Sequence, residues 1–160
     1  MPQIISIVGK SESGKTTLLE KLVPELKKRG YKIGTIKHAS DGFDIDKKGK
    51  DSWRHKEAGA DTVVVASTGK IAMVKNESNE TLDDLEKYFP DMHLVITEGF
   101  KKGNKPKIEV FRAETHRKPL CSDDNNLIAF VTNTRQNLSV PIFGLEEIKE
   151  LADFLEKKYL

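Results

Sequence analysis

Near the start of the chain stands the run Gly9-Lys10-Ser11-Glu12-Ser13-Gly14-Lys15-Thr16-Thr17. It matches the pattern G-x-x-x-x-G-K-[ST] at every fixed position. A short apolar run at 4–8 precedes it, as expected of a buried strand, and apolar residues at helical spacing follow it from Leu18 to Leu26. Strand, glycine-containing loop and helix are the setting that this motif requires, so the sequence predicts a phosphate-binding loop.

The residue types of this loop indicate its chemistry. Gly9 and Gly14 permit backbone conformations that other residues resist, so the loop amides can point inward at phosphate oxygens. We expect Lys15 to reach the β- and γ-phosphates of a nucleotide, and the Thr16 hydroxyl to bind Mg²⁺. Lys15 is also a candidate for a catalytic role. The predicted nucleotide-binding residues of the loop are Gly9, Lys10, Ser11, Glu12, Ser13, Gly14, Lys15, Thr16 and Thr17.

Size and composition indicate an ordinary globular protein. The chain has 160 residues, and we predict a single domain over 1–160. Its net charge is +2, with 27 basic and 25 acidic side chains, so nothing favours nucleic acid or a membrane as a partner. Cys121 is the only cysteine, which excludes an internal disulfide. The first residues show neither a charged n-region nor a cleavable apolar segment, and no apolar run approaches the roughly 20 residues that span a bilayer, so we expect a cytoplasmic protein.

Apolar runs and turn residues divide the chain into alternating strands and helices. The predicted strands cover 3–8, 32–37, 62–66, 71–74, 94–97, 107–112, 127–131 and 140–144. The predicted helices cover 15–29, 51–58, 81–89 and 145–159. A turn at Gly69 separates 62–66 from 71–74, as in an antiparallel hairpin. This order predicts the α/β class: a three-layer P-loop NTPase-like domain, with a mostly parallel sheet and antiparallel additions.

Ligands of such a sheet bind at the carboxyl ends of its strands, so the polar residues there are candidates for the site. The stretch Leu94–Glu98 resembles a Walker B strand, in which a terminal carboxylate meets Mg²⁺. We expect Glu98 to bind the metal, and it is also a catalytic candidate. The alternative is a solvated residue at the end of a strand. Lys37, which ends the strand 32–37, is predicted to contact the nucleotide.

The segment 38–50 is a long polar loop without periodicity. Either it is a solvated acidic loop, or it orders over the phosphates and brings Asp44 near the metal. His38 is a catalytic candidate, since it could bond a phosphate or activate water. A single histidine at a strand end is more often a surface residue.

The choice of base is open at the level of residues. GTPases usually carry Asn-Lys-x-Asp after a late strand, whereas the corresponding place here reads Thr132-Asn133-Thr134-Arg135. Asn133 can pair with the edge of a purine and is predicted to bind the nucleotide. The aspartate that reads guanine is missing, so residue chemistry leaves both GTP and ATP possible.

Several stretches together resemble the MobB family of molybdopterin-guanine dinucleotide biosynthesis adaptor proteins. Many families share the phosphate loop, but the combination of Lys-His, Asp-x-x-Gly-Lys-Asp-Ser and Glu-Gly-Phe-Lys is more specific. The matching stretches follow the family's order, and they are Gly9–Thr17, Thr35–His38, Phe43–Asp46, Gly49–His55, Ala58–Ala60 and Glu98–Lys101.

The resemblance implies a GTP-binding protein with weak GTPase activity that forms a homodimer. It would assist the guanylyltransferase that joins GMP to molybdopterin, so its implied partners are GTP, molybdopterin and that guanylyltransferase. Thr16, Asp44 and Glu98 would lie near Mg²⁺. Ala39 follows His38 in this chain, so a role that needs a second histidine there is not implied.

Other interpretations remain open at this point. Lys10 lies five residues before Lys15, as does the lysine with which one group of phosphate-loop ATPases reaches across a dimer. The alternative is a solvent-exposed loop lysine. A small-molecule kinase, with its acceptor held by the Asp44 loop and Arg54, is a second possible function, but no arginine-rich lid is visible. A metal-delivery GTPase would need a cluster of His and Cys that this sequence lacks.

Overall fold

A computed structural model describes residues 2–78 and 81–160, and the chain falls into two compact units. The first unit combines the residues up to His38 with Leu85–Leu160, and the second is Ala39–Asp84. The second unit therefore interrupts the first in sequence. The single-domain organisation over 1–160 stays a prediction.

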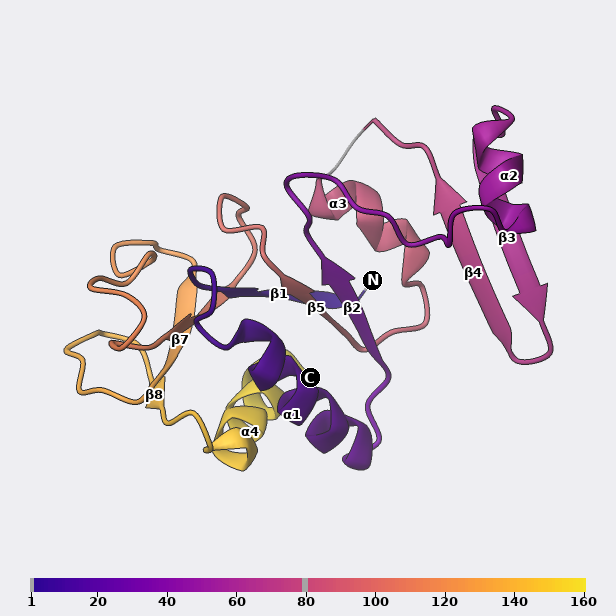
Figure 1. Cartoon of the computed structure of the whole chain (residues 1–160). Helices are drawn as coiled ribbons and strands as arrows, with labels where there is room; N and C mark the ends of the chain where they lie inside the picture. The colour runs from indigo at the N-terminus through magenta and orange to yellow at the C-terminus, as the bar shows by residue number, and fades with distance from the viewer. Residues whose placement is uncertain (1, 79–80) are drawn as a thin grey trace. The chain divides into compact units, whose positions relative to one another are not determined.

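A six-stranded sheet forms the centre of the first unit, and all of its neighbouring strands run parallel (Figure 1). The strand order is β2-β5-β1-β6-β7-β8. The central strands are buried on both faces, which suits their β-branched and apolar composition. The bounds are β1 Gln3–Val8, β2 Ile33–Lys37, β5 Leu94–Glu98, β6 Lys107–Phe111, β7 Leu127–Thr132 and β8 Ile142–Phe143.

The register of the sheet brings several strand ends to the same level. Glu98, the last residue of β5, pairs with Ile7 of β1 on one side and with Lys37 of β2 on the other. Across β1, Val8 pairs with Glu109 of β6. The carboxyl ends of these four strands therefore meet at the loop that follows β1, as expected of an open parallel sheet.

Two helices, α1 (Lys15–Lys28) and α4 (Ile148–Tyr159), lie side by side on one face of this sheet (Figure 1). Leu22 of α1 and Leu155 of α4 are almost completely buried in the main core, together with the apolar residues that β1 and β5 turn to this face. Arg29, just after α1, holds the two helices together through an ion pair of 2.6 Å with Asp153 of α4.

The opposite face of the sheet carries a smaller apolar cluster, which consists of Val8, Phe111, Cys121, Leu127 and Phe130. The irregular segment 112–126, which follows β6, contributes Cys121 to this cluster.

Two charged residues of β6 hold this segment in place. The buried Glu109 carboxylate accepts hydrogen bonds from the backbone N–H groups of Leu120 and Cys121, at 2.6 and 2.8 Å. The buried Lys107 ammonium forms an ion pair with Asp124. Because Lys107 and Glu109 both belong to β6, these contacts tie the conformation of 112–126 to that strand, which lies beside β1.

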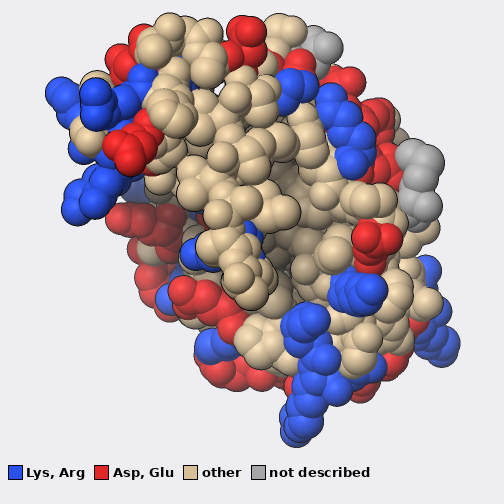
Figure 2. All heavy atoms as spheres, turned by 90° about the vertical axis from the view of Figure 1, so that its right-hand side faces the viewer, with Lys and Arg blue, Asp and Glu red and all other residues tan. Residues whose placement is uncertain are grey.

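The second unit contains α2 (Asp51–Glu57) and an antiparallel hairpin of β3 (Thr62–Ser67) and β4 (Lys70–Lys75), which confirms the predicted hairpin. Val63 is buried on one face of the hairpin. The other face exposes a group of apolar side chains from both strands, namely Val64, Ala66, Ile71 and Met73. Figure 2 shows one face of the molecule, and a broad part of that surface carries no charged side chain.

Some predicted bounds need correction. The helix predicted over 145–159 begins only at Ile148, because the Glu147 carboxylate accepts the Gly144 N–H at 2.6 Å and forms a turn before the helix. The strand predicted over 140–144 is reduced to β8, since Pro141 has no N–H to donate. The helix predicted over 81–89 consists of α3 (Leu82–Leu85) and a 3-10 turn, η1 (Glu86–Tyr88).

The predicted α/β class with a P-loop NTPase-like arrangement is confirmed. The antiparallel strands form a sheet of their own rather than an edge of the six-stranded sheet. Among the described helices, none combines the length and the apolar character that a bilayer crossing requires.

Candidate functional site

The loop between β1 and α1 has the backbone geometry of an anion cradle. Gly9 and Gly14 have φ angles of 150° and 99°, and even Glu12 has a positive φ of 61°. A Cβ atom on Gly9 would lie 2.5 Å from the Val110 carbonyl oxygen, so only glycine fits there. No side chain in the described part of the chain caps the first turn of α1. Its N–H groups can therefore bind an anion.

The Lys15 side chain lies over this loop. Its ammonium donates hydrogen bonds to the carbonyl oxygens of Gly9 at 3.0 Å and Lys10 at 2.7 Å. Burial lowers the pKa of Lys15 below its usual value of 10.5, while the nearby Glu98 carboxylate raises it and the Lys37 charge lowers it. The charge of Lys15 is thus partly desolvated at the place where the motif requires a phosphate ligand.

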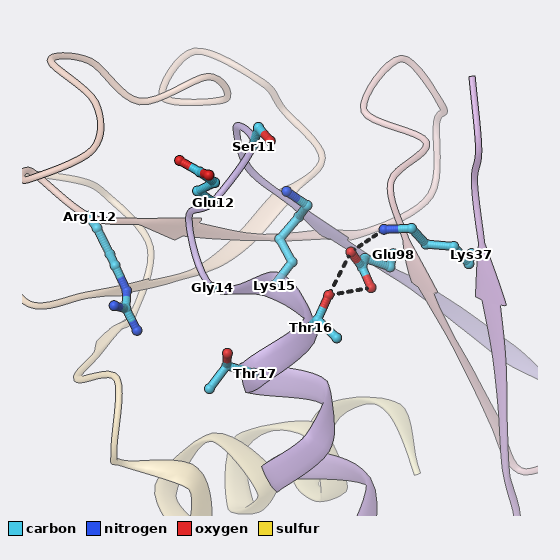
Figure 3. A pocket seen from close by; sticks show the side chains of 9 residues that line it. All are labelled: Ser11, Glu12, Gly14, Lys15, Thr16, Thr17, Lys37, Glu98 and Arg112. Atoms are coloured by element: carbon cyan, nitrogen blue, oxygen red, sulfur yellow. Dashed lines mark hydrogen bonds and ion pairs between the residues drawn. The ribbon is translucent and has the colours of Figure 1, made fainter. Parts of the chain in front are cut away.

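Glu98 is shared between two polar partners at the same edge of the sheet. The Thr16 hydroxyl lies 3.0 Å from each of the two carboxylate oxygens of Glu98, and the Lys37 ammonium forms an ion pair with Oε1 (Figure 3). Only 10% of the Glu98 side chain is exposed, against 63% for Lys37. The structure thus brings Thr16, Lys37 and Glu98 together, as the positions of these residues at the starts and ends of elements predict.

These side chains line a cavity of about 420 Å³ beside the loop (Figure 3). Its lining is strongly polar and carries more basic than acidic groups, which suits a phosphate-bearing ligand. The lining residues are Ser11, Glu12, Gly14, Lys15, Thr16, Thr17, Lys37, Glu98 and Arg112.

The donor set of this cavity fits Mg²⁺. Magnesium in nucleotide sites is held by one or two protein oxygens, with phosphate and water oxygens completing the octahedron. The Thr16 hydroxyl and the Glu98 carboxylate supply such oxygens at the edge of the cavity. Asp44, the third predicted ligand, is an exposed residue of the second unit, and its metal role stays a prediction.

Arg112 lines the cavity but is not among the predicted site residues. It follows the last residue of β6 directly, at the sheet edge that also carries the loop. The available signal was its position at the end of the strand that alternation predicts over 107–112. The sequence does not show that this strand lies next to β1, so the arginine could not be placed beside the loop.

His38 packs against the chain that follows Glu98 and is not one of the residues that line the cavity. Its ring centroid lies 4.6 Å from that of Phe100, and its backbone N–H donates to the Glu98 carbonyl at 3.0 Å. A Cβ atom on Gly99 would lie 2.9 Å from the Cβ of His38, so the close approach depends on glycine. A catalytic role of His38 stays a prediction.

Two other predicted residues make contacts outside the cavity. Asn133 is exposed, and its side-chain amide donates to the Glu114 carboxylate. The charge of Lys10 acts on Glu109, whose pKa it lowers against the larger raising effect of burial. Nucleotide binding by Asn133 and a trans role for Lys10 both stay predictions.

A parallel sheet of this strand order, with a glycine loop and its lysine after the central strand, defines a P-loop NTPase-like protein. More particularly, the chain belongs to the MobB family. The model of that family, described as molybdopterin guanine dinucleotide synthesis protein B, matches residues 4–133.

Known proteins are similar to this chain over nearly its whole length. A molybdopterin-guanine dinucleotide biosynthesis adapter protein of Haemophilus influenzae is 40% identical over 156 residues, which cover 96% of this chain and 87% of that protein. The adapter protein of Escherichia coli is 35% identical over 161 residues, 97% of this chain and 92% of that protein.

Solved structures are similar in fold as well. The crystal structure of a molybdopterin-guanine biosynthesis protein B has a TM-score of 0.74 at 32% identity and covers 96% of this chain and 98% of its own. The crystal structure of Bacillus subtilis MobB has a TM-score of 0.79 at 26% identity, covering 99% and 98%.

Proposed function

We propose that this chain is an adapter protein of molybdopterin guanine dinucleotide biosynthesis that binds GTP with Mg²⁺ beside its phosphate loop. The observation that carries the proposal is the cluster of Lys15, Thr16 and Glu98 at that loop, in a member of the MobB family. The residues after β7 do not decide which base is bound. The guanine part of the dinucleotide in the family's description favours GTP over ATP.

Each part of the site has a distinct task in this proposal. The amides of Gly9–Thr17 hold the phosphates, and Lys15 balances the charge of the β- and γ-phosphates. Thr16 and Glu98 would hold Mg²⁺, with Asp44 as a further proposed ligand. When bound, the ion supplies positive charge to the phosphate oxygens. Lys37, at the rim of the cavity, adds a second cation near the end of the triphosphate.

Hydrolysis in such a site is expected to be weak. Fast hydrolysis requires a group that orients the attacking water. His38, the predicted candidate for that task, packs on Phe100 and does not line the cavity. The site therefore suits storage and presentation of GTP rather than rapid turnover.

The proposed partners follow from this role. They are molybdopterin and the guanylyltransferase that joins GMP to it, in the cytoplasm. We also propose that the chain forms a homodimer. The exposed apolar face of the β3–β4 hairpin supports this, because apolar surface of that kind usually marks a protein contact.

Titration with GTP and ATP, with and without Mg²⁺ and coupled to measurement of phosphate release, tests the proposal. We expect tighter binding of GTP, strengthened by Mg²⁺, and slow release of phosphate. Lys15→Ala should weaken GTP binding at least about tenfold. The matched control is Lys28→Ala, which removes the same charge at the other end of α1. Unchanged GTP affinity in Lys15→Ala would disprove the site, and rapid phosphoryl transfer to a small acceptor would indicate a kinase instead.

A further inference from the structure

Arg112 starts from the same edge of the sheet as the phosphate loop. It follows β6, whose ladder with β1 pairs Val8 with Glu109. At this edge the residue after β1 and the strand β6 come so close that no side chain fits on Gly9 beside the Val110 carbonyl. The Arg112 side chain lines the cavity of the candidate site.

The guanidinium of Arg112 shares its surroundings with the carboxylates of Glu12 and Glu146 but is paired with neither of them. Its Nε is buried and has no hydrogen-bond partner among the described residues. Nε and Nη2 both lie 3.3 Å from the position that a Cβ atom on Gly14 would take. Because Gly14 is the N-cap of α1, the guanidinium lies at the positive end of that helix. Within residues 2–78 and 81–160, no carboxylate forms an ion pair with it.

Without a bound anion, this position of the guanidinium is energetically unfavourable. A buried N–H group without an acceptor is destabilising, and a cation at a helix N-terminus is repelled by the helix dipole. One anion between the guanidinium and the first amides of α1 would remove both effects. Arginine is well suited to such an anion, since its planar fork donates two parallel hydrogen bonds to a phosphate group.

The side of the loop on which Arg112 lies identifies the phosphate. Lys15, Glu98 and Lys37 gather on one side and mark the β- and γ-phosphate end of the ligand. The Arg112 guanidinium lies on the other side, near Gly14 and Thr17 (Figure 3). We propose that Arg112 binds the α-phosphate, the one that carries the nucleoside. This inference rests on the proposed nucleotide binding.

An α-phosphate contact has a recognisable pattern in affinity measurements. It is made by GDP as well as by GTP, so loss of Arg112 must weaken both ligands by the same factor. The contact with the α-phosphate also depends on the two non-bridging oxygens of that phosphorus atom. A sulfur in place of one of them therefore changes affinity in one diastereomer more than in the other.

The experiment compares the parent with Arg112→Ala, Arg112→Lys and Lys15→Ala. GDP, a non-hydrolysable GTP analogue and the two diastereomers of GDP thiolated at the α-phosphate are titrated in Mg²⁺. We expect Arg112→Ala to weaken GDP and the GTP analogue equally, by about 10- to 100-fold, and to remove the preference between diastereomers. Arg112→Lys should recover only part of the affinity, because lysine keeps the charge but not the fork. The control is Arg117→Ala, an exposed arginine of the same segment.

Three results would overturn the inference. They are unchanged affinity in Arg112→Ala, weakening of the GTP analogue alone, and an unchanged preference between diastereomers. The melting temperature of the nucleotide-free Arg112→Ala variant separates binding from folding, and we expect it to equal or exceed that of the parent. If Lys15→Ala also binds nucleotide normally, the proposed function itself fails. If Lys15→Ala loses binding and Arg112→Ala does not, only the role of Arg112 fails.

Discussion

Among single residues, Glu98 has the central place in the site, because it is the shared partner of a hydroxyl and an ammonium group. Its carboxylate lies within reach of Thr16 and Lys37 and is almost fully buried. A buried carboxylate held by such partners keeps its orientation. It is therefore prepared to hold a cation without rearrangement of the backbone.

Glu98→Gln tests this charge, because the amide keeps an acceptor for Thr16 but cannot neutralise Mg²⁺. We expect the affinity for GTP in Mg²⁺ to fall by about 10- to 100-fold, while the affinity in EDTA stays within about twofold of the parent. Calorimetric titrations with and without Mg²⁺ measure both values. Glu20→Gln, an exposed position on α1, is the control. An equal loss in EDTA would show that Glu98 acts on the fold rather than on the metal.

Glu109 makes stability depend on pH. Burial raises its pKa above 4.5, although the N–H groups of Leu120 and Cys121 and the charge of Lys10 lower it. A carboxyl with a raised pKa in the folded state binds its proton more tightly there than in the unfolded chain. Its stabilising effect is thus complete below pH 4.5 and is lost as pH rises through the folded-state pKa.

We therefore expect the parent to lose free energy of unfolding from pH 4.5 upward relative to Glu109→Gln, which cannot ionise. Urea unfolding of both proteins between about pH 4 and about pH 8 measures the difference. A difference that does not change with pH would mean that Glu109 has the same pKa in the folded and unfolded chains.

Among the elements, β6 links the site to the irregular segment that follows it. It carries Lys107 and Glu109, both buried, and each is held by a partner in 112–126. At its end it places Arg112 beside the loop. The strand therefore fixes a long segment without regular structure through charged contacts rather than through apolar packing alone.

Asp124→Ala removes the partner of Lys107, whose side chain is only 3% exposed. We expect the free energy of unfolding to fall by about 3 kcal/mol, because a buried ammonium is left without a counter-charge. In the double variant Lys107→Met with Asp124→Leu, no charge is left unpaired, so most of the loss should be recovered. Chemical denaturation of the parent, Asp124→Ala, Lys107→Met, Asp124→Leu and the double variant measures these differences. A double variant as unstable as Asp124→Ala would contradict this account.

Elements with strong local patterns were predictable from the sequence. The phosphate loop, α1 and the buried strands follow from periodicity and from glycine positions, and the polar ends of β2 and β5 indicated Lys37 and Glu98. The neighbour of β1 was not predictable, because β6 pairs with it across about a hundred residues of chain, and Arg112 was missed with it. The start of α4 was misplaced because the turn depends on the Glu147 side chain rather than on helix propensity.

At the scale of the whole molecule, the chain presents two surfaces of opposite character. The first unit has a polar cavity, and the second has an apolar hairpin face, with Val64 56% and Ile71 74% exposed. Exposed apolar side chains in such a group are unfavourable in water. A second copy of the chain would cover them in the proposed homodimer.

Ile71→Lys places a charge on this face, at the pair that it forms with Ala66. We expect dimerisation to weaken at least about tenfold, because the ammonium would have to be desolvated in the contact. Sedimentation at several protein concentrations measures the dissociation constant. Lys70→Ala, on the opposite face of the same strand, is the control. Helix content by circular dichroism should stay unchanged, and an equally tight dimer in Ile71→Lys would exclude this face.

The position of Ala39–Asp84 within the chain affects how the protein can diversify. Every strand of the six-stranded sheet comes from the flanking sequence, so this insert contributes none of the ladder beneath the loop. A chimaera that received the hairpin of a relative would retain every backbone pairing of that sheet. Mutation can thus alter the hairpin face of the proposed dimer while the geometry around the phosphate loop is inherited unchanged.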